Sequence, residues 1–341
     1  MEVLPYYIAL GMQLKCSAVN KYGSREEVVT HVDSYLKLLK QQIFAAKKFI
    51  GDDLKLIVLP EYFMTSFPMR ESIVEWRDKA CFSQDDKIFE VIGKICIEND
   101  VYISGNYYEQ DNNFPKLFFQ ASFIIDNHGN LILNYRRLNS MYSPTPHDVL
   151  DKYIDLYGYE SLFPVADTPL GKLACIASEE ILYPEVARCL MMRGAEVFLH
   201  SSSEIGSPLM TRKNVAKLAR SIENMAYVVS ANSAGISGIP ILENSTDGGS
   251  KVISYEGITL AEASPGESIV AYAGIHIPSL RIQRETFSMR NYIARQRFDL
   301  YAESYSNYIH YPSNSMEGKS PTKSLFKEIQ KSVIARIYNT I

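Results

Sequence analysis

The alternation of apolar strands with amphipathic helices is the feature of the sequence that most constrains the fold. A helix with apolar residues at steps of three or four follows an apolar strand at about residues 6–14, and a short buried strand follows at 55–59. Further helices are predicted at about residues 85–98, 184–193 and 211–226, and further strands at 101–104, 172–177, 196–200 and 227–232. Because parallel strands need crossover connections that are usually helical, the sequence predicts a layered α/β sheet.

Local signals mark where several of these elements begin and end. Ser24 and Glu27 predict a capping box at the start of the first helix, and Gly51 closes its apolar pattern. The turn-forming residues 127–130 separate two short strands and predict a hairpin. From residue 249 to 275 the pattern changes to strands with glycine and proline turns, so we expect this last part of the sheet to be antiparallel.

The C-terminal part of the chain has a different character. We expect residues 1–300 to form one domain, because residues 304–321 are polar and rich in Tyr, Ser and Asn, as in a linker. An amphipathic helix is predicted at about residues 322–338, and its apolar face needs a partner surface. That face is formed by Leu325, Ile329, Val333 and Ile337. Residues 301–341 are therefore a linker and a helix that packs either on its own domain or on another subunit.

Composition excludes several classes of protein. The formal net charge is −4 and no basic stripe is present, so we expect no nucleic-acid partner and no anionic-membrane surface. The five cysteines are scattered without CxxC or Cys/His spacing, which predicts reduced thiols and neither a metal nor a cofactor site. With no basic leader at the start and no apolar run of about 18 residues, we expect a cytoplasmic protein.

Four polar residues directly follow apolar strands. They are Glu61, Arg137, Ser178 and His200. Taken singly, a charged residue at a strand end is usually solvated or ion-paired. Because ligands of open α/β sheets bind beyond the carboxyl ends of strands, the first three together form a plausible set of acid/base group, charge-stabilising cation and nucleophile for a small-molecule substrate.

Three stretches of the chain resemble motifs of the nitrilase, or carbon-nitrogen hydrolase, superfamily. Residues 57–63 (IVLPEYF) resemble its glutamate motif, 129–137 (GNLILNYRR) its lysine motif, and 171–188 (GKLACIASEEILYPEVAR) its nucleophile elbow. The motifs occur in family order, and the resemblance covers roughly residues 5–300. It implies an αββα sandwich of the nitrilase type, a Glu-Lys-Cys triad, action on a C-N bond, and homo-oligomers.

The chain departs from this family pattern at two of three catalytic positions. Aligned on the motifs, Glu61 matches the general base, whereas Arg137 stands where lysine is expected and Ser178 where cysteine is expected. A serine hydroxyl is a weaker nucleophile than a thiolate and needs an aligned base. Arginine can hold a carboxylate in a two-point pair, which would weaken Glu61 as a proton acceptor. An engineered Ser178 is a further explanation, but Arg137 counts against it because a trapping variant needs only one change.

Three neighbouring residues are candidates for binding the substrate: Tyr62, Glu179 and His200. The backbone amide of Glu179 would serve as an oxyanion donor, while its side chain could simply be solvated. His200 is either a base for Ser178 or a structural histidine at a strand end. By strand alternation Cys175 points away from Ser178, which indicates a core thiol.

Residues 140–147 follow Arg137 and could cover the site as a lid, and no second glutamate of the family pattern is found there. Two functions remain open. One is a hydrolase for an amide, carbamoyl or related C-N substrate, with Ser178 or a water activated by Glu61 as the attacker. The other is a catalytically inactive binding or scaffold protein that has kept the fold and the pocket.

Overall fold

The computed structural model describes residues 3–205, 210–319 and 321–340, and it contains two six-stranded sheets. The first sheet has the order β14 (Tyr272–Ile275), β1 (Tyr7–Gly11), β3 (Leu54–Val58), β4 (Tyr102–Gln110), β5 (Phe118–Ile125) and β6 (Leu131–Arg136). The second has the order β13 (Thr259–Glu262), β12 (Lys251–Ile253), β10 (Tyr227–Ala231), β9 (Val197–Ser201), β8 (Gly171–Ala177) and β7 (Ala166–Thr168). A short pair joins β2 (Cys16–Ser17) to β11 (Ile236–Ser237).

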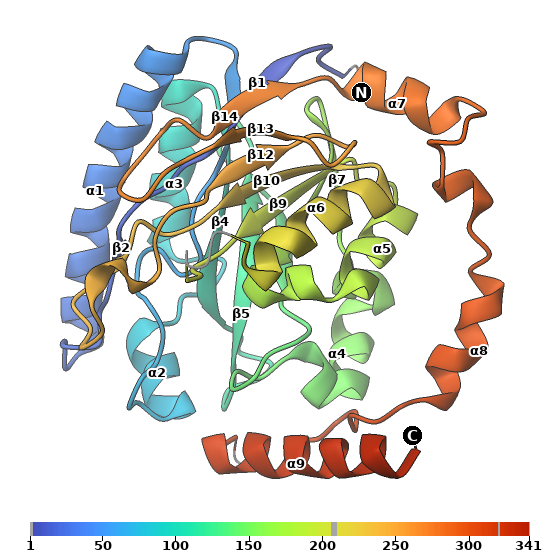
Figure 1. The fold of residues 1–341 in the computed structure, drawn as a ribbon. Coiled ribbons are helices and arrows are strands. Elements are labelled where there is room, and N and C mark those ends of the chain that lie inside the picture. The colour runs from blue at the N-terminus through green and yellow to red at the C-terminus, as the bar shows by residue number, and fades with distance from the viewer. Residues whose placement is uncertain (1–2, 206–209, 320, 341) are drawn as a thin grey trace.

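The sheets face each other and helices cover their outer sides. Helices α1 (Arg25–Ile50) and α3 (Lys87–Asn99) lie on the first sheet, and α5 (Pro184–Met192) and α6 (Arg212–Asn224) lie on the second (Figure 1). Alternation within β3 shows the layering, because Ile57 packs in the core beneath α1 and α3 while Leu56 and Val58 pack against the second sheet. The predicted αββα sandwich is confirmed: the four layers are helices, the first sheet, the second sheet and helices.

The strands that position the site are parallel. Strands β1, β3 and β4 run parallel in the first sheet, as do β8, β9 and β10 in the second. The predicted antiparallel strands near the end of the domain are present, although they belong to two sheets: β12 and β13 extend the second, and β14 pairs with β1 in the first. The carboxyl ends of the parallel strands are therefore free to carry loops and side chains.

The capping signals predicted for the first helix are present. The Ser24 side chain accepts a hydrogen bond from the Glu27 amide, and the Glu27 carboxylate accepts one from the Ser24 amide at 3.0 Å. At the other end Gly51 has φ +108°, a backbone conformation that favours glycine. The sequence thus encodes both ends of α1.

Several helices were not predicted. They are α2 (Ile73–Ala80), α4 (Leu150–Tyr157), α7 (Ile277–Glu285) and α8 (Asp299–Asn307). Helix α2 carries a capping box between Ser72 and Glu75, a signal of the same kind as that of α1. Helix α8 extends into the expected linker at residues 304–321: the first four residues of this polar stretch are helical.

The C-terminal helix α9 (Lys323–Thr340) matches the prediction and packs in part on its own chain. Phe326 is buried and so is Ile329, one turn further along. Gln330 donates a hydrogen bond to the Met141 carbonyl at 2.8 Å, which ties the middle of α9 to the expected lid segment. Figure 1 shows α9 crossing one end of the domain, on the side of α2 and α4. Homo-oligomer formation and the two-part domain division remain predictions.

None of the described helices has the combination of length and apolar character that a bilayer crossing requires.

Candidate active site

The ends of β3 and β9, from different sheets, are hydrogen-bonded to each other. The Glu61 amide donates to the Ser202 carbonyl at 3.2 Å, and the Ser201 hydroxyl donates to the Leu59 carbonyl at 2.8 Å. Strand ends of both sheets are thereby held at one edge of the sandwich. Residues that follow these strands can contact one small molecule.

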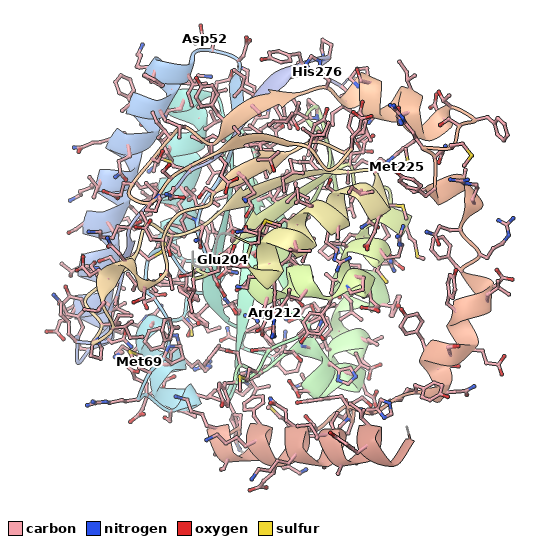
Figure 2. The ribbon with its side chains drawn as sticks, in the orientation of Figure 1. Asp52, Met69, Glu204, Arg212, Met225 and His276 are labelled. Atoms are coloured by element: carbon pink, nitrogen blue, oxygen red, sulfur yellow. The ribbon has the colours of Figure 1, made fainter. Side chains whose placement is uncertain are left out.

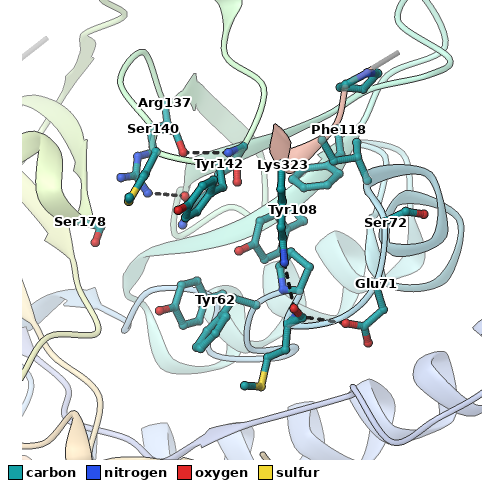
Figure 3. A pocket seen from close by; sticks show the side chains of 18 of the residues that line it. Tyr62, Glu71, Ser72, Tyr108, Phe118, Arg137, Ser140, Tyr142, Ser178 and Lys323 are labelled. Carbon is teal, nitrogen blue, oxygen red and sulfur yellow. Dashed lines mark hydrogen bonds between the residues drawn. The ribbon is translucent and has the colours of Figure 1, made fainter. Parts of the chain in front are cut away.

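A cavity of about 670 Å³ opens at this edge. Five of the residues singled out from the sequence line it: Glu61, Tyr62, Arg137, Ser178 and Glu179. Figure 3 shows Ser178 at one side of the pocket and the aromatic side chains of its wall further along. The structure therefore brings the carboxylate, the guanidinium and the hydroxyl to one cavity, which was the condition for the predicted site.

Glu61 is held by a glutamine that the sequence did not reveal as important. Glu61 is only 3% exposed, and its carboxylate accepts a hydrogen bond from Gln120 Nε2 at 2.6 Å. The same Gln120 accepts one from Arg137 Nη1 at 2.6 Å through its Oε1, and Arg137 Nη1 lies 3.5 Å from Glu61 Oε1. Gln120 is a polar residue within the fully buried strand β5, and that pattern is the signal that could have identified it.

Arg137 is a buried cation whose hydrogen-bond donors are largely engaged. Nε donates to the Asn139 carbonyl at 2.6 Å, and Nη2 forms an ion pair with Glu179. Burial opposes the charge, but the carboxylates of Glu61, Glu179 and Glu180 outweigh it and raise the pKa of Arg137. The guanidinium therefore stays protonated near neutral pH.

Strand alternation explains why Arg137, and not its neighbour Arg136, reaches the cavity. Arg136 lies on β6 and pairs with Glu109 at 2.7 Å and with Asp111 at 2.8 Å. Both of its partners are buried or nearly so, and the cluster attaches the Tyr157 end of α4 to the sheet through Asp111. Arg136 is thus part of the core of the fold, and it is absent from the cavity lining.

Ser178 occupies a turn that strains its backbone. It is 5% exposed and has φ +51°, a left-handed conformation that non-glycine residues rarely adopt and that often marks functional sites. The turn connects β8 to a short 3-10 helix at Ser178–Leu182. The hydroxyl is thereby presented at the end of the strand.

His200 supports this turn from the interior. One ring nitrogen, Nε2, bonds the Ser178 carbonyl oxygen at 2.8 Å, and the other, Nδ1, bonds the Ser230 hydroxyl at 2.8 Å. Burial lowers the pKa of His200 to about 3, so the ring is neutral and donates from Nε2. The structure corrects the expectation that His200 binds substrate, because its side chain is fully buried and lies outside the cavity lining. It also contacts the carbonyl of Ser178 and not the hydroxyl, so it is a structural histidine.

The Ser178 hydroxyl instead contacts a lysine that the sequence analysis did not single out. Lys213 Nζ lies 3.1 Å from Ser178 Oγ and belongs to the first turn of α6, which begins after the cap residue Thr211. A cation is unfavourable at a helix N-terminus, because the helix dipole is positive there. A lysine in this unfavourable position was the signal in the sequence that could have identified Lys213.

Glu180 links the Ser178 turn to the strand end that carries Arg137. Its Oε1 accepts from the amides of Leu138 at 2.8 Å and Asn139 at 2.9 Å, and its Oε2 accepts from the Tyr135 hydroxyl at 2.7 Å. Burial raises the pKa of Glu180, although these donors and Arg137 act in the opposite direction. This carboxylate connects β6 of the first sheet to the turn after β8 of the second.

Aromatic side chains form part of the rest of the cavity wall. Tyr62 and Tyr108 are stacked with ring centroids 6.3 Å apart, and Phe118 lies beside them (Figure 3). Residues 140–143 of the expected lid line the cavity, and so does Lys323 from the start of α9. The cavity therefore has a charged end at Ser178 and an aromatic region further along, and its lining also includes the charged residues Arg70, Glu71, Glu75 and Lys323.

The structure also bears on whether Cys175 is a core thiol and on whether side chains suited to a metal ion lie together. Burial raises the pKa of Cys175 to about 12, and its thiol bonds the Ser104 hydroxyl at 3.6 Å between the sheets, as a core thiol does. Over residues 3–205, 210–319 and 321–340, groups of three or more His, Cys, Asp or Glu side chains suited to a metal ion are not found.

Comparison with known proteins gives a family for most of the chain. A family model described as carbon-nitrogen hydrolase matches residues 12–284. A formamidase of Bacillus thuringiensis (strain Al Hakam) is 26% identical over 245 residues, which is 70% of this chain and 68% of the relative.

Solved structures share the fold at low sequence identity. Nit3 of Saccharomyces cerevisiae, a member of branch 10 of the nitrilase superfamily, matches with a TM-score of 0.63 at 18% identity over 84% of this chain and 96% of its own. An amidase from Nesterenkonia matches with a TM-score of 0.62 at 16% identity, over 91% of this chain and 99% of its own. At such identities these matches establish the nitrilase-type fold alone.

Proposed function

The chain belongs to the carbon-nitrogen hydrolase family, and on that premise we propose that it hydrolyses an amide with Ser178 as the nucleophile. One observation carries the proposal: the strained Ser178 opens into the same cavity as Glu61 and Arg137. In this proposal Arg137 and Ser178 occupy the positions of the family's lysine and cysteine. Hydrolysis is retained, but different residue types carry the roles of the lysine and the cysteine.

The roles follow from the contacts of each residue. Ser178 Oγ attacks the carbonyl carbon, and the Arg137 guanidinium, which stays protonated, stabilises the negative charge that develops on the carbonyl oxygen. Glu61 and Gln120 hold Arg137 in place, and Glu179 adjusts to the substrate because its side chain is partly exposed. Water then hydrolyses the acyl-serine ester.

The cavity indicates an amide larger than formamide. Its volume of about 670 Å³ exceeds the needs of the smallest amides, and Tyr62, Tyr108 and Phe118 offer apolar surface beyond the charged end. The formamidase relatives and the amidase of like fold support the bond type. We therefore propose a carboxamide with an aromatic or extended apolar group, placed so that this group lies on the tyrosine wall.

The test is release of ammonia or amine from a panel of amides, nitriles and N-carbamoyl amines. The natural protein should turn over at least one aromatic amide, and Ser178→Ala should lower kcat/KM by about a thousandfold or more with the fold intact. The proposal fails if the natural protein hydrolyses nothing in the panel while Arg137→Lys with Ser178→Cys does. That result would favour an inactive binding protein with a preserved pocket.

A further inference from the structure

We propose that Lys213 is the general base and acid for Ser178, so that a serine–lysine pair drives the reaction. The proposal rests on the proposed function, because it names the base of the same site. Its starting observation is the 3.1 Å contact between Lys213 Nζ and Ser178 Oγ. Serine–lysine pairs form a known class of hydrolytic machinery on unrelated folds.

The other candidate bases are committed elsewhere. Glu61 accepts a hydrogen bond from Gln120 and lies 3.5 Å from Arg137, so its carboxylate is engaged away from the Ser178 hydroxyl. His200 uses both ring nitrogens for the Ser178 carbonyl and the Ser230 hydroxyl. Lys213 is the group whose contact is with the nucleophilic oxygen itself.

Lys213 is surrounded by groups that already have partners of their own. The charged and titratable groups near it are Glu204, from the segment after β9, Lys217 on the next turn of α6, and His200 on β9. Glu204 is already in a buried ion pair with Lys217, and His200 is neutral. Figure 2 labels Glu204 and Arg212, the residue that begins α6.

The reaction balances with these two residues and water. Neutral Lys213 takes the Ser178 hydroxyl proton while Oγ bonds to the carbonyl carbon, and the resulting ammonium gives that proton to the leaving nitrogen as the C-N bond breaks. Water then attacks the acyl-serine and passes a proton to Lys213. Lys213 returns it to Ser178 Oγ as the ester bond breaks, which releases the carboxylic acid; the amine has already left when the C-N bond broke.

Two variants separate a base from a fixed positive charge. Lys213→Met removes both the charge and the proton acceptor at similar length, whereas Lys213→Arg keeps the charge but cannot accept a proton near neutral pH. Arg212→Gln is the matched control, because Arg212 is the exposed neighbour on the same helical turn. Lys213 is only half-buried, so all three variants should fold, which thermal unfolding would check.

The measurement is the rate of sulfonylation by phenylmethanesulfonyl fluoride as a function of pH, with the modified residue mapped by mass spectrometry. We expect the natural protein to be modified at Ser178 with a rate that rises through one ionisation. Lys213→Met and Lys213→Arg should both react about a hundredfold more slowly and lose that ionisation, while Arg212→Gln should react within twofold of the natural protein.

The pair is overturned if Lys213→Arg reacts like the natural protein, if Lys213→Met loses less than threefold, or if the natural protein is not modified at Ser178. This readout needs no amide turnover, so the two proposals can fail separately. Lysine-dependent modification without hydrolysis of any amide would refute the proposed function and leave the pair standing. Amide hydrolysis that persists in both lysine variants would refute the pair alone.

Discussion

The polar groups around Glu61 and those around Ser178 differ in what they contact. On the Glu61 side (Glu61, Gln120 and Arg137), the polar groups bond to one another, and Gln120 bridges the carboxylate and the guanidinium. On the Ser178 side (Ser178, His200 and Lys213), the histidine fixes the backbone of the turn and leaves the hydroxyl to the lysine. In the proposed mechanism, Glu61 therefore serves to hold Arg137 in place, and the reactivity of Ser178 depends on the lysine that contacts its hydroxyl.

Energetics separate the two sides in the same way. A buried charge network is rigid, and the loss of one member leaves an uncompensated charge that costs several kcal/mol. A left-handed backbone at a non-glycine residue costs on the order of 1–3 kcal/mol and persists only where the surroundings hold it, as His200 holds Ser178. The Glu61 side therefore depends on all of its members being present, and the Ser178 side stores strain.

The largest change in the free energy of unfolding should come from removing the Glu61 carboxylate. Glu61→Ala leaves Arg137 and Gln120 without their shared buried partner, so we expect a loss of about 3–5 kcal/mol in the free energy of unfolding, measured in urea. Ser178→Ala is the matched variant on the other side and should stay within about 1 kcal/mol of the natural protein. If Glu61→Ala is as stable as Ser178→Ala, the Glu61 side is not scaffold and the contrast is lost.

A smaller effect should come from His200, which makes the free energy of unfolding depend on pH. Its pKa is depressed to about 3 in the fold and is near 6.5 when unfolded, so between these values the unfolded chain binds one more proton than the native one. Stability should thus fall as the pH drops below 6.5, with this histidine contributing about 1 kcal/mol of loss between pH 7 and 5.5.

His200→Gln, which keeps a side chain able to bond Ser178 and Ser230, should remove that part of the slope. The measurement is urea unfolding at pH 5.5 and at pH 7 for both proteins. An unchanged slope in the variant would mean that His200 is charged in the fold, and its assignment as a neutral support of the Ser178 turn would be wrong.

The sequence predicted the layers and the strand ends better than the contacts across them. Strand periodicity and capping signals act over short distances, which is why α1 and the cavity positions of Glu61, Arg137 and Ser178 could be predicted. His200 was correctly placed at a strand end, but its side chain turns into the interior, where it meets residues of neighbouring strands.

The missed residues act through tertiary contacts. Lys213 reaches Ser178 from a helix 35 positions later in the chain, Gln120 joins two residues from different strands, and Glu180 connects one sheet to the other. Periodicity alone carries no information on such pairings. A polar residue in an apolar strand and a cation at a helix start were the local traces of two of them.

The most direct test of the central claim is to trap the acyl-enzyme. The natural protein, mixed with an aromatic p-nitrophenyl ester and quenched in acid during turnover, should gain the mass of one acyl group, mapped to the peptide that contains Ser178. The adduct should be absent from Ser178→Ala. Ester turnover without any adduct, or an adduct on another residue such as Cys175, would contradict the account.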